Sequence, residues 1–135
     1  MDRHDELTAH VAIVGVVDDD PAVRNSLKFS LEVEGFVARI YPDAQALLDE
    51  PVLSHFDCLV ADQSMPGMTG LDLVSALRAR KILVPAVLIT SHPPKALVAR
   101  AGAAAVPIVE KPLLGNALIE KIRDVIRAGM QPTAH

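Results

Sequence analysis

The sequence predicts an α/β domain in which helices cover both faces of a five-stranded parallel sheet. Apolar runs typical of strands alternate five times with segments of helical spacing. The first run, "HVAIVGVVD", is continuously apolar, which is typical of a strand buried on both faces. Right-handed crossovers between parallel strands place the helices on both sides of the sheet. The 135 residues, half of them hydrophobic, suffice for one domain with a real core.

The first strand and helix have the clearest boundaries. The strand covers residues 10–18, and the helix covers "PAVRNSLKFSLEVEG" at residues 21–35. Asp20 is a suitable helix N-cap, Pro21 suits the first helical position and Gly35 suits the end. The inward positions of this helix share helical spacing: Val23, Leu27 and Leu31.

The same alternation continues to the end of the chain. Further strands are expected at residues 36–41, 57–62, 85–90 and 105–110. Further helices are expected between Asp43 and Pro51 and at residues 71–80, 94–103 and 116–129. The segment "SMPGMTG" is expected to be a loop because of its proline and glycines. One domain is therefore expected over residues 10–128, with flexible termini at 1–9 and 129–135.

Composition excludes several classes of function. A net charge of −4 and a pI near 5.6 argue against direct nucleic-acid binding. No run reaches the roughly 18 apolar residues of a membrane helix, and the polar N-terminus does not resemble a secretory signal. The single Cys58 cannot form an internal disulfide, which is consistent with a cytoplasmic location.

Polar side chains gather where the predicted strands end. Parallel strands place all their carboxyl ends at one edge, where ligands of open α/β sheets bind. The strand ends deliver these groups: Asp18, Asp19, Asp20, Asp62, Thr90, Ser91, Glu110 and Lys111. Clustered carboxylates suit a hard cation such as Mg²⁺, and a lysine with a hydroxyl suits a phosphoryl group. Asp62 would then be both a metal ligand and a nucleophile that forms an aspartyl phosphate.

Each of these residues also has a simpler interpretation. Asp20 alone is best explained as a helix cap, but Asp18 and Asp19 cannot both be caps. Asp62 could be an ordinary turn residue, Thr90 is a common type at a strand end, and Lys111 could be a surface lysine. The functional interpretation rests on their convergence at one edge.

The chain resembles the receiver domain of two-component response regulators. The resemblance covers residues 10–128 through "VVDDDPAVR", "LVADQSMPGMTGLDLV", "VPAVLIT" and "VEKP", in the expected order and spacing. It implies a flavodoxin-like (βα)5 receiver fold. The match resembles most closely the receivers that other proteins join to a helix-turn-helix output domain.

The resemblance assigns roles to particular positions. Asp62 matches the aspartate that accepts a phosphoryl group from the phosphohistidine of a sensor histidine kinase. Asp19 matches the direct Mg²⁺ ligand, Asp18 a ligand acting mostly through water, and the backbone carbonyl of Ser64 the third protein ligand. In addition, Thr90 matches the switch hydroxyl, Lys111 the lysine that pairs with the phosphoryl group, and Pro112 a proline often preceded by a cis bond.

The resemblance also implies partners and argues against enzymes with similar folds. The implied partners are a sensor histidine kinase, a downstream output protein and, through residues 94–129, a second copy of the chain. The domain is expected to be a phosphoacceptor, not an enzyme, although it could catalyse its own phosphorylation and dephosphorylation. A haloacid-dehalogenase-like hydrolase would need a second aspartate where Ser64 stands, and no P-loop is present. A pseudo-receiver that binds partners without being phosphorylated is the alternative.

Three features depart from the family pattern. Ile108 stands where many receivers carry Tyr or Phe, the segment "TSHPPKALVARAGAAAV" is slightly short, and Gly102 is displaced from its usual place. Isoleucine is stiff and has no polar tip. We therefore expect Thr90 to move on phosphorylation and the outward signal to come mainly from the helix at 94–103 and its Pro93-Pro94 entry loop.

Overall fold

A computed structural model describes residues 11–130 and confirms the predicted fold class. Five parallel strands form one sheet in the order β2-β1-β3-β4-β5. The strands are β1 (Ile13–Val17), β2 (Val37–Tyr41), β3 (Cys58–Asp62), β4 (Ala86–Thr90) and β5 (Ile108–Glu110). The order places β1, β3 and β4 in the interior of the sheet, and all residues of β3 and β4 are buried.

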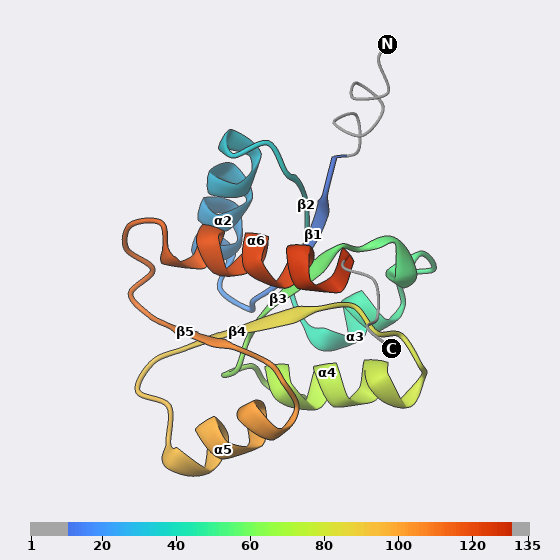
Figure 1. The fold of residues 1–135 in the computed structure, drawn as a ribbon, viewed down its shortest axis with the longest axis vertical. Helices are drawn as coiled ribbons and strands as arrows, with labels where there is room; N and C mark the ends of the chain where they lie inside the picture. Colours follow the sequence, from blue (N-terminus) through green and yellow to red (C-terminus); the bar gives the residue numbers. More distant parts are fainter. Residues whose placement is uncertain (1–10, 131–135) are drawn as a thin grey trace.

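Helices cover both faces of the sheet (Figure 1). One face carries α2 (Pro21–Val33) and α6 (Ala117–Met130), and the other carries α3 (Ala44–Leu48), α4 (Gly70–Ala79) and α5 (Lys95–Ala103). The core therefore has two aliphatic layers. On the first face Leu31 and Ile122 are fully buried, and on the second Leu47 and Leu73 are.

Side chains cap three of the helices where the sequence provides an oxygen. The Asp20 carboxylate accepts the Ala22 N–H at 2.9 Å at the start of α2, as expected. Asp43 and Thr69 cap α3 and α4 in the same manner. These caps satisfy N–H groups that have no partner within the helix, and they fix where each connection ends.

The structure corrects several predicted boundaries. Strand β5 begins at Ile108 and not at residue 105, because Ala105 has a φ of 58° and Pro107 has no amide hydrogen to donate. A short 3₁₀ helix at Leu53–His55 was not expected. Helix α6 continues to Met130, one residue beyond the predicted helix end at residue 129. Residues 1–10 and 131–135, which include most of the predicted flexible termini, lie outside the described part of the chain.

Candidate functional site

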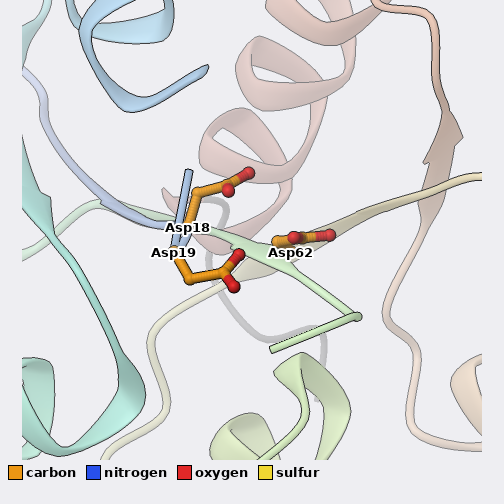
Figure 2. Close-up of side chains that lie close together, drawn as sticks. All are labelled: Asp18, Asp19 and Asp62. Carbon is orange, nitrogen blue, oxygen red and sulfur yellow. The ribbon is translucent and has the colours of Figure 1, made fainter. Parts of the chain in front are cut away.

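The sheet brings the predicted acidic residues together at its carboxyl edge. Strands β1 and β3 are neighbours with Val17 paired to Ala61, so the next residues, Asp18 and Asp62, lie side by side. Carboxylate oxygens of Asp18, Asp19 and Asp62 lie within 4.8 Å of one another (Figure 2). The predicted convergence of these three acids is confirmed by this geometry.

Asp18 is the most constrained member of the cluster. It is fully buried, and its Oδ1 accepts the backbone N–H of Asp20 at 2.9 Å. Its Oδ2 is buried and has no hydrogen-bond partner in the described structure. Burial, reinforced by the nearby charge of Asp62, raises the pKa of the Asp18 carboxyl above its ordinary value. A buried carboxylate oxygen without a partner is costly, so this site favours a cation beside it.

The three consecutive aspartates have three different environments. Asp18 is buried in the cluster, Asp19 is exposed but directs a carboxylate oxygen toward the same cluster, and Asp20 caps α2. This division explains how a chain can place three acids directly after its most hydrophobic strand. Asp20 caps α2, whereas Asp18 and Asp19 lie beside Asp62 at the end of β3.

Lys111 supplies the positive charge of the site. Its Nζ lies 3.4 Å from Oδ1 of Asp62 and 3.8 Å from Oδ2 of Asp18, and its side chain is 27% exposed. The residue follows β5, and its backbone N–H donates to the Thr90 carbonyl at 2.8 Å. The peptide bond between Lys111 and Pro112 is cis, as the resemblance implied.

Thr90 and Ser64 lie at the same edge of the sheet. Thr90 is buried at the end of β4, one residue beyond the partner of Asp62 in the β3–β4 pairing. Ser64 is exposed in the connection that follows β3, and its N–H donates to Oδ1 of Asp62 at 3.3 Å. Both residues therefore lie at the predicted edge of the sheet, and among residues 11–130 no hydrogen bond joins Thr90 to Asp62.

The residues present are suitable ligands for a divalent cation. Carboxylate oxygens are the donors that Mg²⁺ prefers, and it is typically held by one or two carboxylates together with waters. The Oδ2 of Asp18, which accepts no hydrogen bond, and the carboxylates of Asp19 and Asp62 supply such donors. The acidic cluster could therefore bind a metal ion.

Arg24 is a residue of the site that the sequence reasoning missed. Its guanidinium donates to the backbone carbonyl of Asp18 at 2.7 Å, which fixes the turn that presents the acids. A basic residue in the first turn of a helix is disfavoured by the helix dipole. That unfavourable placement in α2 was the signal available in the sequence.

Comparison with known proteins agrees with this geometry. The family model described as "Response regulator receiver domain" matches residues 14–123. The chain belongs to the response-regulator receiver family.

Curated relatives are longer regulators. The chain is 40% identical over 113 residues to the transcriptional regulatory protein FixJ of Bradyrhizobium diazoefficiens, covering 83% of this chain and 55% of FixJ. It is 33% identical over 118 residues to the C4-dicarboxylate transport transcriptional regulatory protein DctR of Rhodobacter capsulatus, covering 85% and 60%. The chain thus spans little more than half the length of these relatives.

Solved structures of receivers share the fold. Full-length FixJ from B. japonicum is similar at a TM-score of 0.80 and 35% identity, covering 88% of this chain and 59% of that one. The isolated FixJ-N structure is similar at a TM-score of 0.77 and 29% identity, covering 92% and 99%. No helix within residues 11–130 is long and apolar enough to span a membrane.

Proposed function

We propose that this receiver accepts a phosphoryl group on Asp62 from the phosphohistidine of a sensor histidine kinase, in a reaction that requires Mg²⁺. The observation that carries the proposal is the buried Oδ2 of Asp18, which accepts no hydrogen bond and lies in a cluster with Asp62 and Lys111. An ion pair between Lys111 and Asp62 with only a structural role would not require a second buried carboxylate, that of Asp18, whose burial costs free energy. The cluster instead has the charge balance of a site for a cation and an anion together.

The chain's own residues account for the chemistry of the transfer. A carboxylate oxygen of Asp62 forms a bond to phosphorus as the bond from phosphorus to the histidine nitrogen breaks, and that nitrogen leaves with the bonding electrons. Lys111, already 3.4 Å from Asp62, pairs with the oxygens of the incoming group. The Thr90 hydroxyl, at the end of the neighbouring strand, donates to the same group. A Mg²⁺ ion held by Asp18, Asp19, Asp62 and the Ser64 carbonyl would neutralise charge on the phosphoryl oxygens.

The proposal makes this domain a phosphoacceptor and not an enzyme with a separate substrate. Its partners are a sensor histidine kinase and a downstream output protein or domain. A second copy of the chain is a further partner, through the face formed by α5, β5 and α6. Val98 of α5 is 50% exposed, which gives this face an apolar contact residue.

The decisive experiment measures the covalent labelling of the protein by acetyl phosphate. In the presence of Mg²⁺ the wild type is expected to gain one phosphoryl group, detected by intact mass, and the gain is expected to be lost with a metal chelator. Asp62→Asn should gain none, and Lys111→Ala should react more slowly. Asp20→Asn is the matched control, because asparagine caps a helix as well as aspartate, and it should label like the wild type.

Two results would contradict the proposal. Equal labelling of the wild type and Asp62→Asn would show that the acceptor is a different residue. No labelling of a folded wild type, by acetyl phosphate or by a cognate kinase, would favour the pseudo-receiver alternative.

A further inference from the structure

Gln63, the residue after the proposed phosphoacceptor, makes three hydrogen bonds that join separate elements. Its backbone N–H donates to the Ile89 carbonyl of β4 at 3.0 Å. Its side-chain Oε1 accepts the Leu71 N–H of α4 at 2.9 Å, and its backbone carbonyl accepts the Gly70 N–H at 3.4 Å. One residue therefore bonds both to the neighbouring strand and to the first turn of the next helix.

These bonds join the two ends of the β3–α4 connection, because they link Gln63 to the first residues of α4. The first N–H groups of a helix have no partner within the helix and need one from outside. Gln63 satisfies the first two in α4, and Thr69 Oγ1 satisfies the third, on Asp72, at 3.2 Å. Residues 64–69 therefore form a loop whose two ends are joined by the hydrogen bond between Gln63 and Gly70, and Ser64 is the first residue of this loop.

The start of α4 also rests directly on the backbone of Asp62. A Cβ atom built on Gly70 would lie 2.7 Å from the Asp62 carbonyl oxygen and 2.9 Å from a methyl carbon of Leu88. Only a glycine allows this approach. Because close-packed groups transmit small displacements, a shift of α4 would move the Asp62 backbone.

We propose that Gln63 is a positioning residue of the site, which fixes the Asp62 backbone and the Ser64 carbonyl in the place that metal binding requires. This inference deepens the proposed function and rests on it. Gln63 touches neither the metal nor the phosphoryl group. It acts through the hydrogen bonds of its neighbours, as the outer residues around a metal ligand commonly do.

Three variants separate positioning from ordinary stability. Gln63→Met keeps the length of the side chain but removes the oxygen that accepts the Leu71 N–H. Gln63→Glu keeps an acceptor oxygen at the same position and should restore what methionine loses. Thr69→Ala removes a cap of the same helix, on Asp72, without touching residue 63, and is the matched control.

The first measurement uses the metal-free protein and amide NMR. Gln63→Met should speed amide hydrogen exchange at Leu71 and at Ser64, whose N–H donates to Asp62 Oδ1, and Gln63→Glu should restore both rates. Thr69→Ala should speed exchange at Asp72 and leave Ser64 unchanged. Exchange at Ser64 that is as slow in Gln63→Met as in the wild type would overturn the inference. This result does not depend on metal binding or on phosphorylation.

The second measurement is the affinity for Mg²⁺ alone, from the same NMR signals during a titration. Gln63→Met should bind on the order of tenfold more weakly than the wild type, with Gln63→Glu and Thr69→Ala much closer to it. Equal affinity of Gln63→Met and the wild type, or an equal loss in Thr69→Ala, would overturn the positioning role while Asp62 labelling remained intact. If the wild type bound no Mg²⁺, the proposed function would fall with it.

Discussion

The connections that follow β3 and β4 lie at the same edge of the sheet but are built differently. The β3–α4 connection is closed by Gln63, capped by Thr69 and packed through Gly70 onto the Asp62 backbone. The β4–α5 connection has none of these devices. Its helix begins after Pro94 without a side-chain cap, and His92 adopts a φ of 47°. A positive φ is uncommon for a residue other than glycine, although histidine adopts it more often than most residues do.

Helix α5 is also weakly attached to the body of the protein. Its buried residues are Leu97 and Ala101, whereas α4 buries five residues. A groove of about 370 Å³, lined by Thr90 and Leu97 among others, separates α5 from the β3–α4 connection. Arg78 of α4 donates to the Ala104 carbonyl, and Arg100 of α5 pairs with Asp72 at 3.5 Å in an exposed contact. An exposed pair of this kind stabilises little.

This difference teaches how a site can be both fixed and responsive. The half that carries Asp62 is held by backbone hydrogen bonds and close packing, so it would preserve the geometry of the proposed phosphotransfer. The half that carries Thr90 leads into a helix with few buried contacts, and low contact density is typical of segments that move. The response to phosphorylation should therefore concentrate in α5.

The largest expected effect on the free energy of unfolding comes from replacing one glycine with alanine in α4 and, separately, one in α5. Gly70→Ala adds a methyl group against the Asp62 carbonyl and should destabilise the protein by about 1–3 kcal/mol, the usual cost of overpacking. Gly102→Ala in α5 adds the same group where no atom lies within 4 Å, and should stabilise the helix by about 0.5 kcal/mol. Denaturant unfolding measures both. Equal effects in the two helices would contradict the contrast in packing.

A second, smaller effect concerns the free-energy cost of burying the charged carboxylate of Asp18. Because burial raises the pKa of Asp18 in the folded state, the folded protein holds this proton more tightly than the unfolded chain does. Stability from this group is fully present below the ordinary pKa of 3.8 and is lost as pH rises through the raised pKa. Above that window Asp18→Asn should make the metal-free protein more stable by about 1 kcal/mol.

The measurement is the difference in unfolding free energy between the wild type and Asp18→Asn as a function of pH, without metal. Adding Mg²⁺ at ten times its Kd should stabilise the wild type by about 1.4 kcal/mol and the variant by less. A difference that does not change with pH would show that burial of Asp18 carries no such cost. Asp20→Asn, which changes an acid outside the cluster, controls for general charge effects.

Much of the fold and the position of the acids could be predicted from the sequence, because both follow from local patterns. Alternating apolar runs and helical spacing predicted five parallel strands with helices on both faces, and the strand ends placed Asp18, Asp19 and Asp62 at one edge. The end of α5 at Ala103 agrees with the predicted helix at residues 94–103, but the backbone conformation that follows it could not be predicted. Ala105 adopts a φ of 58° with bonds from Ala105 N–H to Gly102 and from Val106 N–H to Ala101, where glycine is the usual residue.

Contacts between distant elements could not be predicted in this way. The Arg24 bond to the Asp18 carbonyl and the Gln63 bond to Leu71 depend on the path of the loops in three dimensions. A single glutamine or arginine has no periodic pattern that would reveal its partner. The attachment of α5 to α4 through Arg78 and Arg100 has the same character.

The central claim is that a phosphoryl group on Asp62 is read out through Thr90 and α5 while the β3–α4 connection holds still. The most direct test compares amide NMR signals of the free protein and its beryllofluoride complex, with Mg²⁺ present in both. We expect large shifts at Asp62, at Thr90 and across residues 92–101, and smaller ones at Ile108 and along α4. Dominant shifts at Ile108 or within α4, with residues 92–101 unchanged, would contradict the account.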